Sequence, residues 1–141
     1  MRLHRCSYAK KLTDRFAVCA KFADDDAAAR RYARDPDGPY GFYYWNLLTK
    51  RRAHGSVEIF KHDPTLPDAA VTPEYLLDHL VICGSVNRVV DQLLAFRETV
   101  GDFGTLLYCG HDWADPQLAR RSMELMAEKV MPAVNAAVRL Q

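Results

Sequence analysis

The chain has 141 residues, of which 49% are hydrophobic and 26% are charged. This composition favours one globular domain with an apolar core over a disordered chain. The 19 basic and 18 acidic residues leave a net charge of +1. Such a balance argues against the concentrated basic face that nucleic acids and anionic membranes require. All apolar runs fall short of the roughly 20 residues that span a bilayer.

Four cysteines are spread along the chain as Cys6, Cys19, Cys83 and Cys109. They form no CxxC pair and no disulfide framework, so we expect buried free thiols in a reducing compartment. The basic N-terminal stretch MRLHRCSYAKK is not followed by an apolar segment, which does not fit a signal peptide. We therefore expect a cytoplasmic location.

The first predicted elements are a strand and a helix. Residues 15–22 (RFAVCAKF) are mostly apolar and bounded by charge, which predicts a strand. Asp24, Asp25 and Asp26 follow, and acidic residues at this point cap a helix N-terminus and complement its dipole. The segment AAARRYAR then predicts a helix whose arginines lie toward its C-terminal end.

An aromatic and proline-rich insertion is predicted at about 35–71. Turn-forming residues within it precede a helix over about 42–53, which Gly55 ends. Aromatic side chains crowd this region as YGFYYW, and such residues are more often core than substrate pocket. The stretch FKHDPTLPDAAV predicts an ordered loop, after which Thr72 caps a helix with Pro73 as its first residue.

A second strand is predicted at 80–83, ending at Gly84. Ser85 then caps a helix that runs to about residue 100. Its apolar residues recur at helical spacing and define the inner face, as Val89, Val90, Leu93, Leu94 and Phe96.

A third strand is predicted at 105–109, ending at Gly110. After a short corner, Asp115 and Pro116 provide an N-cap and a first residue for the last helix. Pro132 lies inside that helix and is expected to kink it. Strands that alternate with helices predict a parallel sheet, whose chemistry collects at the carboxyl ends of the strands. The insertion would rise from the same end as a lid or pocket wall.

The corner between the third strand and the last helix carries several reactive side chains. Cys109, His111 and Asp112 are metal-ligand types, but their spacing matches no structural zinc pattern, and we expect no metal. A Cys109–His111 nucleophile pair is little better supported, because Cys109 ends an apolar run. The corner is best explained as a helix entrance, with Asp112 or Asp115 as the cap and Trp113 packed onto the core. In the remaining alternative, His111 and Trp113 line a ligand pocket.

Two further features leave their function open. Gly84 and Ser85 could bind phosphate at a helix N-terminus, although they equally form an ordinary strand-to-helix turn. No GxGxxG or GxxxxGK[ST] fingerprint supports a nucleotide site. Three other histidines, His54, His62 and His79, could join a site only through the fold.

Residues 81–135 resemble the C-terminal end of bacterial luciferase-like flavin-dependent monooxygenases, closest to the limonene-monooxygenase-like branch. The resemblance rests on four motifs in order: GSVNRVVDQLLAF, GDFGTLLY, GHDWAD and RRSMELMAEKVMP. Upstream, residues 15–80 are similar to the preceding unit and insertion of that family. One departure is Val86, where the family usually has proline at the start of the helix.

The resemblance implies an α/β fold whose parallel βα units form the C-terminal part of a TIM (β/α)₈ barrel. Such barrels take about 250 residues, so a chain with three strands is an incomplete barrel. The flavin-phosphate site and best-known catalytic histidine of the family lie upstream of the matched region, so no catalytic residue is assigned here. An open piece of barrel exposes strand edges, and we expect a homo-oligomer or pairing with the missing upstream half.

The resemblance also implies an activity, in which reduced flavin reacts with O₂ and one oxygen atom enters a small organic substrate. FMN or a deazaflavin would serve as cofactor, and a flavin reductase is a candidate partner. Gly110, His111 and Trp113 would then line the flavin or substrate at the barrel mouth. One alternative is a non-catalytic fragment or interaction module that binds no flavin. Another is a small stand-alone α/β flavoprotein.

Overall fold

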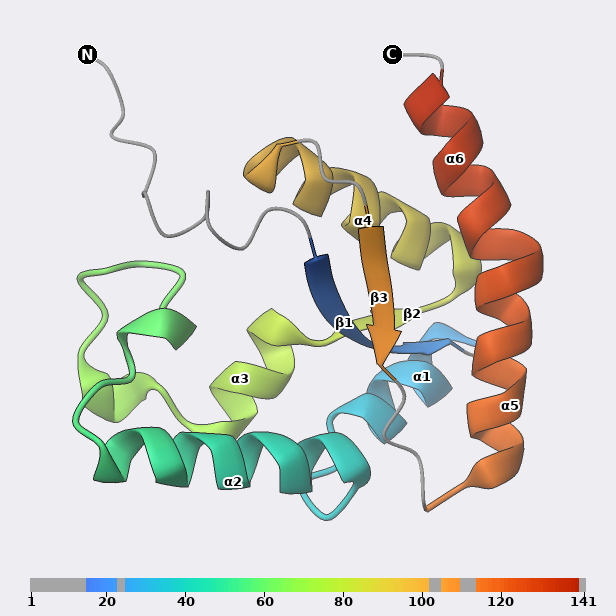
Figure 1. The fold of residues 1–141 in the computed structure, drawn as a ribbon. Helices are drawn as coiled ribbons and strands as arrows, with labels where there is room; N and C mark the ends of the chain where they lie inside the picture. The colour runs from blue at the N-terminus through green and yellow to red at the C-terminus, as the bar shows by residue number, and fades with distance from the viewer. Residues whose placement is uncertain (1–14, 23–24, 102–104, 110–113, 140–141) are drawn as a thin grey trace, which may run out of the picture.

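A computed structural model describes residues 15–22, 25–101, 105–109 and 114–139; for 15–22 and 109 only the backbone is considered. The fold is mostly helical, with three strands among the helices (Figure 1). The strands are β1 (Arg15–Phe22), β2 (Ile82–Gly84) and β3 (Thr105–Cys109). The helices are α1 (Asp26–Ala33), α2 (Pro39–Ala53), α3 (Pro73–Leu80), α4 (Val86–Val100), α5 (Pro116–Leu125) and α6 (Met131–Arg139). Short 3₁₀ helices, Glu58–Phe60 and Asp68–Ala70, lie between α2 and α3.

The three strands form one sheet in the order β2-β1-β3, and both pairings are parallel. The predicted parallel arrangement is therefore confirmed. The order itself was not predicted, because β1 lies in the centre, with β2 paired to its C-terminal half and β3 to its N-terminal half. A barrel wound in chain order would place β2 between the other two strands. This sheet therefore does not establish the expected partial barrel.

Two helix boundaries differ from the prediction. α2 begins at Pro39 rather than near residue 42, because proline at the first helical position has the right φ and loses no hydrogen bond there. Gly41, expected in a turn, lies inside this helix, where a Cβ would sit 2.2 Å from the carbonyl oxygen of Pro36. The second strand begins at Ile82 rather than residue 80, because α3 continues through Leu80.

The predicted helix starts at Thr72–Pro73 and Asp115–Pro116 are confirmed by their caps. The Thr72 hydroxyl accepts from the backbone N–H of Tyr75 at 3.2 Å, and α3 starts at Pro73. The irregularity expected at Pro132 takes the form of a π-helical turn, Met126–Val130, directly before α6. Proline offers no N–H to the preceding turn, and a π turn is one way a helix accommodates that loss.

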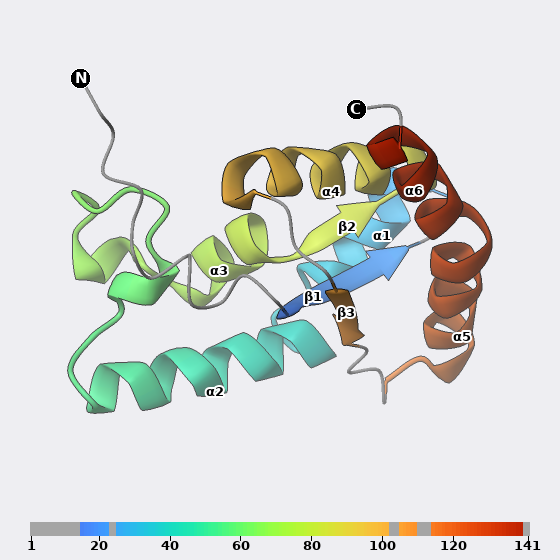
Figure 2. The same cartoon turned by 45° about the horizontal axis from the view of Figure 1, so that its top comes forward.

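Two apolar clusters form the core, and β2 separates them because successive strand residues face opposite sides. Cys83 belongs to the first cluster and Ile82 packs against the second. The first joins α1, α2 and α3 through Ala33, Tyr40, Tyr44, Leu48, Val57, Phe60, Val71, Leu76, Leu77 and Val81. The second joins α4 to the last helices through Val89, Leu93, Leu125, Met126 and Val130. In Figure 2 the strands lie between α4 above and α2 below. No helix in the described ranges is long and apolar enough to cross a membrane.

Candidate functional site

The candidate site lies where the three parallel strands end. β1 and β2 end level with each other, since Phe22 pairs with Gly84. β3 ends at Cys109, opposite Cys19 and three residues before the end of β1. Functional groups of α/β folds gather at this end of the sheet, so the described residues around these strand ends form the candidate site.

The three residues predicted to line a ligand, Gly110, His111 and Trp113, lie outside the described residues, as does Asp112. The two sides of that corner are described. Before it, β3 runs to Cys109 as predicted. After it, the Asp115 carboxylate accepts from the backbone N–H of Leu118 at 2.8 Å, and Pro116 starts α5. The capped helix entrance is thus confirmed at Asp115, and the lining role stays a prediction.

Consecutive aspartates at the start of α1 have different roles. Asp25 is the N-cap of α1, and its carboxylate accepts from the backbone N–H groups of Ala27 and Ala28 at 3.0 and 3.2 Å. Asp26 instead reaches the neighbouring βα unit, where its Oδ1 accepts from the backbone N–H of Ser85. Its Oδ2 lies 3.8 Å from a guanidinium nitrogen of Arg88 on α4. Asp26 therefore joins the β1–α1 and β2–α4 turns.

The environment of Asp26 keeps it ionised. Hydrogen bonding from the Ser85 backbone N–H is the largest cause that lowers the pKa of this carboxyl, and the charges of Arg88 and Arg30 lower it further. Desolvation opposes these effects without reversing them. A carboxylate consequently lies at the N-terminal end of α4 at neutral pH, where it complements the helix dipole.

Gly84 is required for this junction by its backbone and by its surroundings. Its φ of +142° lies in a region that L side chains rarely adopt. A Cβ there would lie 2.8 Å from both Asp26 Oδ1 and Arg88 Cδ. The glycine that ends the strand therefore lets the carboxylate approach the turn.

The junction argues against a phosphate site at Gly84–Ser85. The Ser85 N–H that would bind an anion already donates to Asp26, and the carboxylate would repel a second negative charge. Ser85 occupies the predicted N-cap position, but its side chain makes no capping hydrogen bond with any described residue. Ser85 is thus the N-cap residue of α4 as predicted, but its side chain does not supply the capping hydrogen bond, and its own backbone N–H donates to the Asp26 carboxylate.

Tyr32, on the last turn of α1, lies near the corner that follows β3, and the sequence alone did not single it out. Burial is the largest cause that raises the pKa of its phenol, followed by the charges of Asp115 and Asp35. Hydrogen bonding to the Asp115 backbone opposes the rise. A protonated Tyr32 therefore lies beside the helix entrance that follows the predicted pocket residues. The sequence could not predict that Tyr32 lies beside Asp115, because a single tyrosine among the arginines of a helix is not a recognisable motif.

Among the side chains that the structure describes, Cys83 is a free thiol. It is 5% exposed, and burial raises the pKa of its thiol despite the opposing charges of Arg34, Arg30 and Arg88. Cys83 is therefore a protonated core residue rather than a nucleophile, as expected for a buried free thiol.

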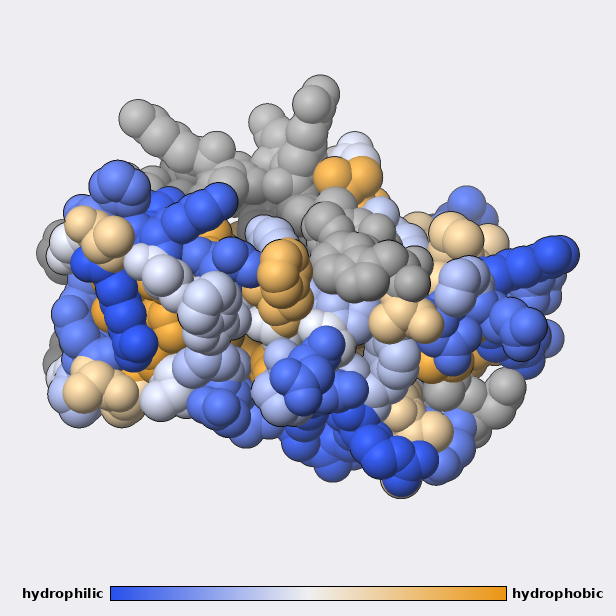
Figure 3. All heavy atoms as spheres, turned by 90° about the horizontal axis from the view of Figure 1, so that it is seen from below, coloured by the Kyte–Doolittle hydropathy of each residue, from blue (hydrophilic) through white to orange (hydrophobic). Residues whose placement is uncertain are grey.

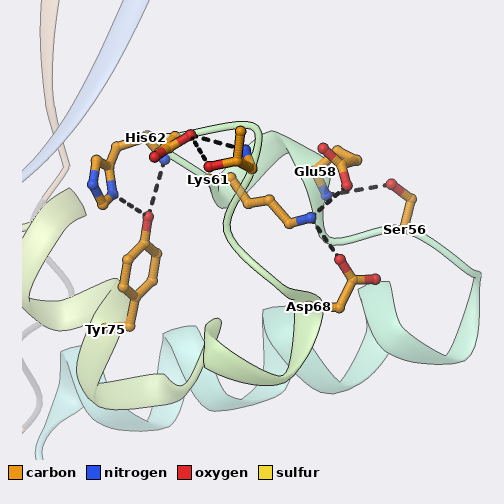
Figure 4. A network of polar contacts seen from close by, with 8 residues as sticks. Ser56, Glu58, Lys61, His62, Asp68 and Tyr75 are labelled. Carbon is orange, nitrogen blue, oxygen red and sulfur yellow. Dashed lines mark hydrogen bonds and ion pairs between the residues drawn. The ribbon is translucent and has the colours of Figure 1, made fainter.

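The fold brings His62 and His79 together, away from the strand ends. Their rings stack with centroids 4.6 Å apart, and Tyr75 lies against both. The Tyr75 hydroxyl accepts from the His62 backbone N–H at 3.0 Å and bonds to His62 Nδ1 (Figure 4). Because α3 leads into the start of β2, this cluster lies at the opposite end of that strand from Gly84. Among the side chains that the structure describes, no three His, Cys, Asp or Glu converge to hold a metal.

Lys61 stabilises the connection between α2 and α3 through two ion pairs. Lys61 Nζ lies 2.6 Å from carboxylate oxygens of both Glu58 and Asp68, and its side chain is 5% exposed (Figure 4). These ion pairs connect the two 3₁₀ helices of the predicted ordered loop. Their geometry explains an ordered connection between α2 and α3 rather than a catalytic lysine.

The aromatic segment divides between core and surface. Tyr40 and Tyr44 are buried in the first cluster, which confirms a core role for part of the segment. Phe42 and Trp45 project from the opposite side of α2 and are more than half exposed. The face seen from below in Figure 3 accordingly mixes apolar side chains with hydrophilic ones.

Comparison with known proteins identifies two relatives by sequence. A 3,6-diketocamphane 1,6-monooxygenase of Pseudomonas putida is 29% identical over 114 residues, which are 79% of this chain and 30% of the relative. A 4-hydroxyprotoasukamycin monooxygenase of Streptomyces nodosus subsp. asukaensis is 35% identical over 95 residues, or 67% of this chain and 23% of the relative. No family model matches the chain.

A solved structure also resembles the fold. It is a type II Baeyer–Villiger monooxygenase, the oxygenating constituent of 3,6-diketocamphane monooxygenase from the CAM plasmid of P. putida, in complex with FMN. The two share 28% identity with a TM-score of 0.71, over 84% of this chain and 33% of that one. This chain thus spans about a third or less of its relatives' length. The predicted resemblance is confirmed, and the partial coverage fits a C-terminal portion.

Proposed function

We propose that this chain, a relative of the luciferase-like flavin-dependent monooxygenases in sequence and fold, forms the C-terminal part of such an enzyme. The observation that carries the proposal is the likeness to the FMN-bound oxygenating constituent, which extends over most of this chain. The activity would be flavin-dependent insertion of one oxygen atom from O₂ into a small organic substrate.

In this proposal, residues 1–141 form one domain within a larger (β/α)₈ barrel, with the insertion at about 35–71. Three parallel strands, each followed by a helix, support the assignment. The strand ends would form part of the barrel mouth, where Gly110, His111 and Trp113 would line the flavin or substrate. Asp115 would hold the start of α5 behind them through its bond to Leu118.

The cofactor best supported is reduced FMN, which would supply the chemistry that activates O₂. The Gly84–Ser85 turn, which was the predicted phosphate candidate, does not fit its phosphate group. The Ser85 N–H at the N-terminus of α4 donates to Asp26, and this carboxylate would repel a phosphate. The phosphate would therefore be held by the part of the barrel that precedes these strands. Residues of this chain would shape the mouth and exclude water.

The partners follow from the same likeness. The solved neighbour is named as the oxygenating constituent of its enzyme, which supports a separate flavin reductase as partner here. The remaining part of the barrel, or a second copy of this chain, would cover the exposed sheet edges. The cytoplasmic location stays a prediction from cysteine usage.

A domain exchange tests the proposed function. The region of the P. putida 3,6-diketocamphane 1,6-monooxygenase that matches this chain is deleted, and the product is called the shortened relative. Residues 15–139 of this chain are then joined in place of the deleted region. Oxygenation of 3,6-diketocamphane is measured with reduced FMN and O₂. We expect the joined protein to restore activity that the shortened relative lacks. A folded joined protein no more active than the shortened relative would overturn the proposal.

A non-catalytic interaction module is a second candidate, favoured by the exposure of Phe42 and Trp45 on α2. It predicts self-association of the chain without flavin. Replacement of both residues by serine should then convert a dimer into a monomer in sedimentation velocity, and an unchanged monomer before and after replacement would remove this candidate.

A further inference from the structure

We propose that β3 occupies the edge of β1 at which the rest of the barrel docks, and that docking moves β3 to the far edge of β2. The proposal rests on the proposed function, because its partner is the set of preceding βα units of a flavin monooxygenase barrel. It concerns strand exchange, and can fail while the proposed function stands.

The strand order is the first observation. In a barrel each strand lies beside the strands that precede and follow it, so β3 should pair with β2 after crossing through α4. Instead β3 pairs with β1 from Arg15–Thr105 to Cys19–Cys109. The edge that a preceding strand would need on β1 is therefore taken by the strand that comes last. In the described ranges, the far edge of β2 carries no strand.

The two faces of β3 are the second observation. Leu106 and Tyr108 pack against the cluster formed by α4 and the last helices. Leu107 points to the other side and is 52% exposed. Strands of parallel sheets are normally covered on both faces, whereas the face of β3 that carries Leu107 is exposed. A move that completes the barrel would cover this second face.

The contrast with β2 is the third observation. Asp26 ties the end of β2 to α1 through Ser85, and Cys83 and Ile82 belong to clusters on opposite sides of β2. β2 is thus held by its contacts with α1 and with both clusters, as well as by its ladder with β1. The Tyr108 hydroxyl lies 2.8 Å from Ser122 Oγ, which keeps β3 on α5. β3 and α5 would therefore move together while β1 and β2 stay paired.

The occupant of the vacated edge is the strand that precedes β1 in a complete barrel. The matched relatives contain more than twice as much chain outside the matched region as within it, which is enough for the other βα units of a barrel. An open strand edge is a template for a further strand, and an occupied one is blocked. β3 would protect the edge of β1 until those units are available.

The register supplies a direct test. Cys19 and Cys109 are paired positions on neighbouring strands. Paired backbones lie about 5 Å apart, within the range that a disulfide spans. A chain with Cys6→Ser and Cys83→Ser keeps these two cysteines, and mild oxidation should cross-link them. Adding Cys19→Ser gives the matched control, which cannot form the bond.

Oxidised and reduced chains are each mixed with the shortened relative and separated by size exclusion. We expect the reduced chain and the control to form a complex, and cross-linking to lower its yield at least tenfold. Equal complex formation by both forms would overturn strand exchange, as would failure of the cross-link to form or of the reduced chain to bind.

FMN added to the complex separates the two proposals. A complex of the reduced chain without FMN would count against the proposed function alone, whereas an FMN-binding complex of the cross-linked chain would count against strand exchange alone.

Discussion

Gly41→Ala should destabilise the protein, although alanine is the better helix former. In the interior of a helix, replacing glycine by alanine adds about 1 kcal/mol of stability. Here the new Cβ would lie 2.2 Å from the Pro36 carbonyl oxygen and 2.5 Å from that of Asp35. Both are backbone atoms, so no side-chain rotation relieves the overlap. Overpacking of this kind typically costs about 1–3 kcal/mol, and tighter contacts cost more.

The expected net effect is a destabilisation of about 1–2 kcal/mol, because overpacking outweighs helix propensity. For a domain of this size, that corresponds to a fall in melting temperature of about 3–8 °C. The assay is thermal and urea unfolding followed by far-UV circular dichroism and by tryptophan fluorescence. Coincident transitions by the two probes would indicate a two-state transition.

Thr49→Ala provides the matched control in the same helix. Thr49 is exposed, so its replacement should leave stability unchanged or raise it by up to about 0.7 kcal/mol through helix propensity. Stabilisation by both substitutions would refute the reasoning, since it would mean that the first turn of α2 is not packed on residues 35–36.

Three further substitutions probe the strand-end junction and its supports. The pKa of Asp26 is lower in the folded chain than its ordinary value of 3.8, so its stabilisation is present above that value and lost as pH falls through the lowered one. Asp26→Asn should therefore reduce the loss of stability that the protein shows in urea unfolding as the pH falls below 3.8, and an unchanged loss of stability in acid would contradict the bond of Asp26 to Ser85. Asp115→Ala removes the cap of α5 and should cost about 1 kcal/mol in urea unfolding, whereas an effect under a few tenths would count against the cap. Tyr108→Phe leaves the fully buried Ser122 hydroxyl without this partner and should cost about 1–3 kcal/mol, and a neutral result would argue against their contact.

Local signals predicted the helices and strands well where one residue type has one physical role. Thr72 and Asp115 cap helices that begin with proline, and β1 follows the apolar run at 15–22. The start of α2 could not be predicted in this way, because Gly41 is typical of a turn. Only the fold shows that it is needed for close packing on Pro36.

The order of the strands in the sheet could not be predicted from the sequence pattern. Alternation of strands and helices predicts parallel pairing but leaves the neighbours of each strand open. The order depends on which edge and which apolar face are available, as the packing of Leu106 and the exposure of Leu107 illustrate. A three-stranded piece can therefore adopt an order that a closed barrel excludes.

Of the candidate site, the sequence predicted the start of the helix that follows the corner at 110–113. The sequence predicts Asp115 as a cap, and the structure confirms it. The successive aspartates were interpreted as local helix caps, which holds for Asp25. Asp26 instead bonds to Ser85, 59 residues later in the chain, and no local spacing encodes that contact. The lining roles of His111 and Trp113 stay predictions.

The binding stoichiometry of FMN tests the central claim most directly. Equilibrium dialysis would compare the 141-residue chain with residues 15–139 joined to the shortened relative. If this chain forms the C-terminal part of a flavin monooxygenase, the joined protein binds one FMN per chain and the isolated chain binds none. Equal binding by the isolated chain, or a folded joined protein that binds none, would contradict it.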